Sequence, residues 1–113
     1  MDKLIKNIEH SEVLNLAGQV DYQEGQIVSK TLAQNKCYSV TLFAFEKGEE
    51  IGAHDSTGDA FVLVLDGVGK YTIGDKEYIL HKDEAIVMPA KVSHAVYAEE
   101  RFKMLLTVLF PVT

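Results

Sequence analysis

Short apolar segments separated by turn residues are the feature that most constrains the fold of this chain. Cys37 to Phe45 is rich in β-branched and aromatic residues, and segments of this kind recur up to the last one, residues 102–110. About ten of them, spaced by roughly eight to ten residues and without an amphipathic helix among them, are typical of a β-sandwich or β-barrel. A chain of 113 residues has room for one hydrophobic core. We therefore predict a single all-β domain over residues 1–113.

The ends and turns of this domain follow from local sequence. Residues 1–12 mix apolar and charged side chains and predict an N-terminal arm or an edge strand, and the barrel core is expected over about 26–110. Residues 13–34, interrupted by glycines, predict short strands and turns. Asp66-Gly67 and Gly74-Asp75 are strong hairpin signals. They predict a meander of short strands joined by tight turns.

Charge and cysteine content exclude several classes of function. The chain has 11 Lys and Arg against 17 Asp and Glu, which gives a net charge of −6 at pH 7. Binding to phosphate backbones needs clustered basic side chains, so we expect no nucleic-acid partner. The single cysteine, Cys37, excludes an intrachain disulfide and suits a reducing compartment. The chain shows neither an N-terminal apolar signal segment nor a long apolar run, so we expect a cytoplasmic protein without membrane contact.

Two histidines lie on separate predicted strands. The stretch from Gly48 to Gly67 begins with a predicted turn, contains His54 and ends in an apolar run. His94 follows Pro89 by five positions, at the start of another apolar segment. Two histidines on different strands of a closed sheet can meet in its interior, around a metal ion or another ligand.

Alternation along the strand after His54 leaves both of its faces apolar. If His54 faces the interior, the residues on the same side are Ser56, Ala60, Val62 and Val64. The residues on the opposite side are Phe61, Leu63 and Leu65. A small barrel without helices has nothing of its own to cover that outer face except more sheet or a second copy of itself. We therefore predict a homodimer joined through sheet faces or exchanged edge strands.

The spacing around both histidines resembles the two sequence motifs of the cupin family, in particular those of small single-domain bacterial cupins. The first motif reads Gly, five residues, His, one residue, His, three or four residues, Glu, six residues, Gly; its positions here are Gly48, His54, Ser56, Ala60 and Gly67. The second reads Gly, five residues, Pro, one residue, Gly, two residues, His, three residues, Asn; its positions here are Asp83, Pro89, Lys91, His94 and Ala98. The spacing is kept, whereas half of the usual metal-binding set is replaced.

This resemblance implies a double-stranded β-helix, or jelly-roll barrel, of two facing antiparallel sheets with a pocket between them, and it makes a dimer common. In metal-binding cupins, three histidines and a glutamate hold a divalent iron, manganese, nickel, zinc or copper ion in that pocket. Carried over position by position, His54 and His94 are the candidate metal ligands. A third ligand would have to come from outside the motifs, for example from Asp59 if Gly58 hosts a bulge.

Three functions follow from these residues. Loss of the glutamate and of one histidine enlarges the pocket and makes it more apolar, which favours binding a small molecule. Besides the two histidines, the candidate pocket residues are Ser56, Ala60, Met88, Tyr97 and Met104. The second function is a metal-dependent enzyme of the dioxygenase, isomerase or decarboxylase type that uses His54 and His94. The third is a structural or regulatory homodimer.

Overall fold

The computed structural model describes residues 3–112, so Met1, Asp2 and Thr113 of the predicted domain lie outside the described residues. Within residues 3–112 the chain forms eight strands and one short 3₁₀ helix. These elements are η1 (Leu16–Gln19), β1 (Ile27–Gln34), β2 (Tyr38–Phe45), β3 (Glu50–His54), β4 (Asp59–Ile73), β5 (Lys76–His81), β6 (Ala85–Met88), β7 (His94–Tyr97) and β8 (Phe102–Leu109). The all-β prediction is confirmed. No helix in the described range is long and apolar enough to cross a bilayer.

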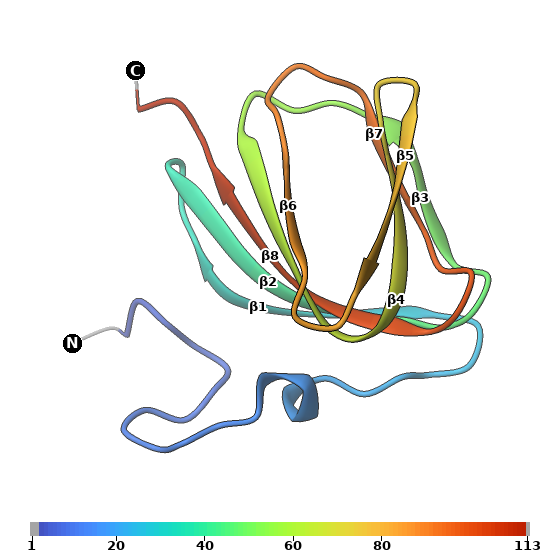
Figure 1. The fold of residues 1–113 in the computed structure, drawn as a ribbon. Coiled ribbons are helices and arrows are strands. Elements are labelled where there is room, and N and C mark those ends of the chain that lie inside the picture. The colour runs from blue at the N-terminus through green and yellow to red at the C-terminus, as the bar shows by residue number, and fades with distance from the viewer. Residues whose placement is uncertain (1–2, 113) are drawn as a thin grey trace.

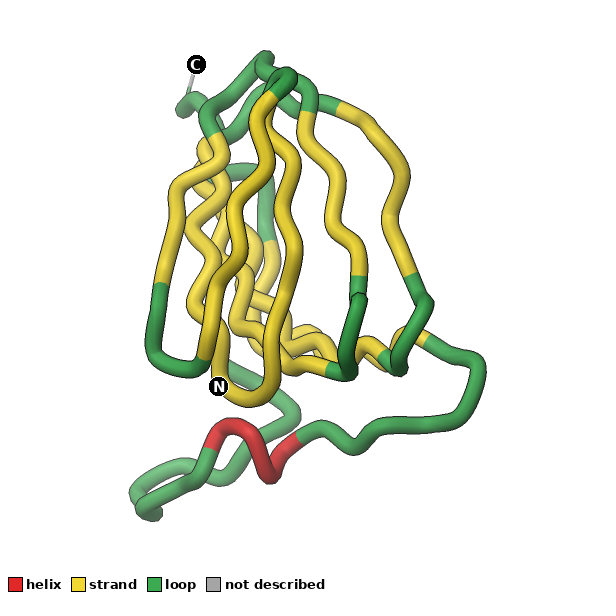
Figure 2. The backbone as a smooth tube through the Cα atoms, turned by 45° about the vertical axis from the view of Figure 1, so that its right-hand side comes forward, coloured by secondary structure: helices red, strands yellow, loops and turns green. Residues whose placement is uncertain are grey.

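The strands form two antiparallel sheets that curl towards each other (Figures 1 and 2). The large sheet has the order β1-β2-β8-β4-β6. The small sheet has the order β3-β7-β4-β5. β4 belongs to both, because its first half pairs with β8 and its second half with β5 and β7. Two facing antiparallel sheets around one core make the predicted jelly-roll barrel.

The course of β4 corrects the hairpin predicted at Asp66-Gly67. The strand continues through these residues, and its pairing with β8 shifts register between Val64 and Asp66. Gly67 has a φ of +74°, and a Cβ at this position would overlap the carbonyl oxygen of Arg101. A bulge next to a left-handed glycine bends a strand and lets it pass from one sheet to another. Gly67 is therefore a corner of the barrel, whereas Gly74-Asp75 does join β4 to β5 in a hairpin.

Residues 3–26 form an arm that runs beneath the outer face of the large sheet (Figure 1). This arm contains η1 and no strand, so the short strands predicted for residues 13–34 occur only from Ile27 onwards. The described part of the predicted N-terminal segment is likewise an arm rather than an edge strand. Its apolar side chains that pack on the sheet are Ile8, Leu16, Val20 and Tyr22.

The arm also corrects the expectation that this chain has nothing of its own to cover the outer face. Leu65 and Tyr22 belong to the same apolar cluster, which lies between the arm and the large sheet. The Tyr22 hydroxyl donates a hydrogen bond of 2.5 Å to Asp66 Oδ2, which ties the arm to the corner of β4. Earlier in β4, Leu63 is half-buried and Phe61 is 45% exposed. Irregular chain can cover a sheet as well as a helix does when it supplies apolar side chains at the right places.

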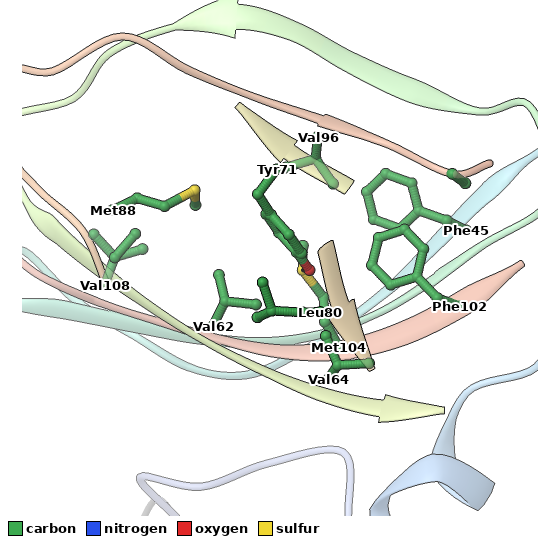
Figure 3. Close-up of a cluster of buried hydrophobic side chains, with 12 residues drawn as sticks. Phe45, Val62, Val64, Tyr71, Leu80, Met88, Val96, Phe102, Met104 and Val108 are labelled. Atoms are coloured by element: carbon green, nitrogen blue, oxygen red, sulfur yellow. The ribbon is translucent and has the colours of Figure 1, made fainter. Parts of the chain in front are cut away.

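Large aromatic side chains fill one end of the space between the sheets, which we call the filled end (Figure 3). Phe45 and Phe102 stack with ring centroids 4.7 Å apart. Tyr71 is fully buried beside them, and its hydroxyl donates to Met104 Sδ at 3.1 Å. Burial raises the pKa of the Tyr71 hydroxyl, so this side chain stays neutral. These buried rings pack against each other in the space between the sheets at this end.

Candidate functional site

A cavity of about 140 Å³ lies between the sheets at the other end of the barrel, which we call the open end. Met88 and Val108 border it, on the side of the core away from Phe45 and Phe102 (Figure 3). Its lining residues are Ile51, His54, Ser56, Ala60, Met88, His94, Val96, Met104, Leu106, Val108 and Phe110. All but three of these side chains are apolar.

His54 and His94 face each other across the edge of the small sheet. They are direct partners in the pairing of β3 with β7, after a register shift between Ile51 and His54. Their ring centroids are 4.3 Å apart and the rings are tilted by 68°. His54 is exposed and His94 is 6% exposed. The pair therefore lies where the cavity meets solvent.

Backbone carbonyls fix the orientation of both imidazoles. Nδ1 of His54 lies 2.9 Å from the carbonyl oxygen of Gly52, and Nδ1 of His94 lies 3.3 Å from that of Val92. A carbonyl oxygen can only accept a hydrogen bond, so the neutral form of each ring carries its proton on Nδ1. Nε2 of each ring then has a lone pair and can act only as an acceptor.

The surroundings of His94 favour its neutral form. Burial lowers the pKa of His94 below its usual range, and the neighbouring His54 ring lowers it further. The hydrogen bond to Val92 and the charge of Asp55 act in the opposite direction. At neutral pH the open end therefore presents His94 as an uncharged imidazole.

Hydrogen bonds join the loop before β4 to the loop before β7, one on each side of the cavity. The backbone N–H of Lys91 donates to the carbonyl oxygen of Ser56 at 2.7 Å. The N–H of Ala90 donates to Asp59 Oδ1 at 2.8 Å, so this carboxylate holds the loop and does not line the cavity. Asp83 and Lys91 stand where the cupin motif has glycine, and both have a left-handed φ, 71° and 66°. The backbone at these two motif positions is therefore left-handed, although neither residue is a glycine.

The residues present do not fit a metal ion. His54 and His94 supply two nitrogen donors, Ala60 supplies none, and the Ser56 hydroxyl lies 3.1 Å from the carbonyl oxygen of Gly58. Among residues 3–112, no group of three or more His, Cys, Asp or Glu side chains could hold a metal. Zinc and non-haem iron sites in proteins commonly use at least three protein ligands.

The structure brings together all of the predicted site residues except Tyr97. His54, His94, Ser56, Ala60, Met88 and Met104 line the same cavity. Tyr97 does not line it and is 38% exposed, which corrects its assignment to the pocket. Side chains alternate along β7, so an inward His94 places Val96 inside and Tyr97 outside. The same alternation would have found Val96 and, along β8, Leu106 and Val108, which the sequence analysis missed.

Comparisons with solved structures find similar proteins over nearly the whole chain. A conserved protein of unknown function from Streptococcus pyogenes is 43% identical, with a TM-score of 0.96, 99% of this chain covered and 98% of that chain covered. A cupin superfamily protein from Desulfitobacterium hafniense is 32% identical, with a TM-score of 0.90 and coverages of 95% and 98%. A cupin 2 conserved barrel domain protein from Leptotrichia buccalis is 49% identical, with a TM-score of 0.83 and coverages of 85% and 47%.

A search of curated proteins found no match. The family model described as "Cupin domain" matches residues 41–110, which include both histidines and both motifs. This match spans more than half of the chain, and the first two structural neighbours cover 99% and 95% of the chain. The chain therefore belongs to the cupin family.

Proposed function

We propose that this protein binds a small organic molecule in the cavity at the open end. The observation that carries the proposal is an apolar cavity with the His54–His94 pair at its boundary with solvent. Ligand sites are typically concave and mostly apolar, with a few polar groups that fix the orientation of the ligand. Ser56 and Ala60, at positions where the family motif has larger metal ligands, leave the space that such a molecule would fill.

Thermal unfolding in the presence of mixtures of small organic compounds tests this proposal. A ligand that binds the folded state alone raises the unfolding temperature by mass action. The Ala60→Leu variant, which fills the cavity, should lose this stabilisation. Ala85→Leu is the matched control because Ala85 is exposed and lies outside the cavity. A folded Ala60→Leu protein that is stabilised as strongly as the wild type would contradict the proposal, as would the failure of every compound.

Elemental analysis separates this function from metal-dependent catalysis. We expect negligible bound metal in the purified protein and in a His54→Ala variant after incubation with divalent iron, manganese, nickel, zinc or copper. Near-stoichiometric metal in the wild type that is absent from the variant would replace the proposal by a metal site at His54 and His94.

We also propose that the protein forms a homodimer through the part of the outer face that the arm leaves uncovered. Phe61, Val87 and Leu109 are 45%, 50% and 61% exposed and lie on the neighbouring strands β4, β6 and β8. Contiguous exposed apolar side chains often mark an interface. The Phe61→Glu variant should sediment as a monomer or lose solubility. A wild-type monomer, or a dimer unchanged by this substitution, would contradict the assignment of this face.

A further inference from the structure

We propose that the cavity takes a small ring compound with a hydrogen-bond donor, such as a phenol, whose ring lies against the apolar wall and whose donor contacts His54 or His94. This inference rests on the proposed function above and names the chemical class of its ligand. Three features of the open end support it, namely the size of the cavity, the acceptor character of its polar groups and the charge around them.

The size and wall of the cavity suit one ring. An apolar cavity of about 150 Å³ stays dry and accepts a benzene molecule, and the cavity here measures about 140 Å³. Met88 and Met104 lie in its wall, and a thioether sulfur makes favourable contacts with the edge of an aromatic ring. The sulfur of Met104 already accepts the Tyr71 hydroxyl, so Met88 is the thioether left to contact a ligand.

The polar groups of the cavity accept hydrogen bonds. Both imidazoles have Nδ1 at a backbone carbonyl, which leaves Nε2 as an acceptor in the neutral ring. Within residues 3–112 no buried side-chain nitrogen or oxygen lacks a partner, and the contact of His94 is made by Nδ1. Nε2 of His94 is therefore not a sealed atom, and the His94 side chain lines the cavity. A donor on the ligand gains a partner there, whereas an acceptor does not.

Fixed charges near the pair disfavour an anion. Asp55 follows His54 directly, and its charge acts on His94. The other charged side chains near this end are Lys91, on the facing loop, and Asp59, the first residue of β4, whose carboxylate accepts from Ala90 N–H. Two carboxylates against one ammonium give this end a negative balance, so a carboxylate ligand would be repelled while a hydroxyl group would not.

Affinities of phenol, toluene and benzoate for the wild-type protein, measured at neutral pH by NMR titration, test the ligand class. Toluene matches phenol in shape but has a methyl group in place of the donor. In a purely apolar cavity phenol would bind more weakly, because its hydroxyl would lose water without gaining a partner. We expect phenol to bind at least as tightly as toluene, and benzoate to bind weakest. Tighter binding of toluene or benzoate, or no binding of phenol, would overturn the inference.

Variants locate the acceptor. In His94→Phe the preference for phenol over toluene should fall by about tenfold, the usual net worth of one hydrogen bond. His54→Phe is a second variant that changes an exposed side chain and so has little effect on folding. An unchanged preference in both variants would contradict the proposed contact. Imidazole ¹⁵N shifts of the free wild-type protein must also show the proton of each neutral ring on Nδ1; protonation on Nε2 would refute the argument without any variant.

These outcomes separate the ligand class from the function itself. Binding of toluene or benzoate that is abolished by Ala60→Leu would retain the small-molecule pocket and discard the donor requirement. Failure of all three probes would discard the ligand class, while the wider compound mixtures decide whether the cavity binds any molecule.

Discussion

The two ends of the barrel share the same sheets and differ in the size of the side chains between them. At the filled end the fully buried rings of Phe45, Tyr71 and Phe102 pack in the interior. At the open end the small side chains of Ala60 and Ser56 line the cavity. The backbone of a jelly roll thus sets where a pocket can exist, and the volume of a few inward side chains decides at which end it exists.

The largest difference between the ends should appear when a phenylalanine is truncated. Phe102→Ala removes a fully buried ring from the filled end and should lower the free energy of unfolding by about 3–5 kcal/mol. Phe110→Ala, at the open end, removes a partly exposed ring that borders an existing cavity, so its cost should be less than half as large. Denaturation by urea measures both values. Equal losses would show that the ends are packed alike.

The next largest loss of stability is expected at Gly67, the corner where β4 passes from the large sheet to the small sheet. Gly67→Ala forces a Cβ into the carbonyl of Arg101 at a left-handed φ, and should cost at least about 2 kcal/mol. Gly25→Ala is the matched control, because Gly25 has a φ of +70° but no atom within 4 Å of its added Cβ. The loss of stability in this control is the conformational cost alone, about 1 kcal/mol for a residue with a Cβ at a left-handed φ. A Gly67→Ala loss no larger than that of Gly25→Ala would refute the close approach.

Enlarging one alanine at each end gives a smaller and more specific contrast. Ala98→Leu overpacks a site with 0% exposure and should destabilise by about 1–3 kcal/mol. Ala60→Leu places the same side chain in the cavity, where room is available, so its stability should stay close to that of the wild type. Thermal and urea unfolding check both. A comparable loss in Ala60→Leu would mean that the cavity is not accessible to a side chain of this size.

The smallest expected effect concerns the loop at the open end. Lys91→Gly relieves a left-handed φ of 66° and should raise the free energy of unfolding by about 0.5 kcal/mol, after the entropy cost of glycine is subtracted. Lys36→Gly, at an exposed loop position without a left-handed φ, should instead lower it slightly. If both variants lose stability equally, Lys91 is not strained.

Local patterns predicted most of the strands, because each of them alternates or is continuously apolar over its own length. The strand predicted at 37–45 is observed as β2 (Tyr38–Phe45), and His54 and His94 lie on separate strands as predicted. The path of β4 does not, since Asp66-Gly67 has the same local signature whether the chain reverses or bulges, and the close approach of Arg101 decides between them. That contact joins residues far apart in sequence.

An N-terminal arm was one of the two forms predicted for residues 1–12, but the contacts that hold it against the sheet and the orientation of the imidazoles were beyond local patterns. The arm is held by long-range contacts such as that of Lys103 Nζ with the Ala17 carbonyl, 2.5 Å, and these have no sequence signal. Tyr97 is different, because the alternation that placed His94 inside already placed Tyr97 outside. Strand alternation alone therefore excludes Tyr97 from the pocket once His94 is placed inside.

A crystal structure of the wild-type protein under xenon pressure tests the difference between the two ends most directly. Xenon enters dry apolar cavities of this size and is located unambiguously by its scattering. We expect a xenon atom at the open end, near Met88, Met104 and Val96, and none between Phe45 and Phe102. Xenon at the filled end, or its absence from the open end of a pressurised crystal, would contradict the account.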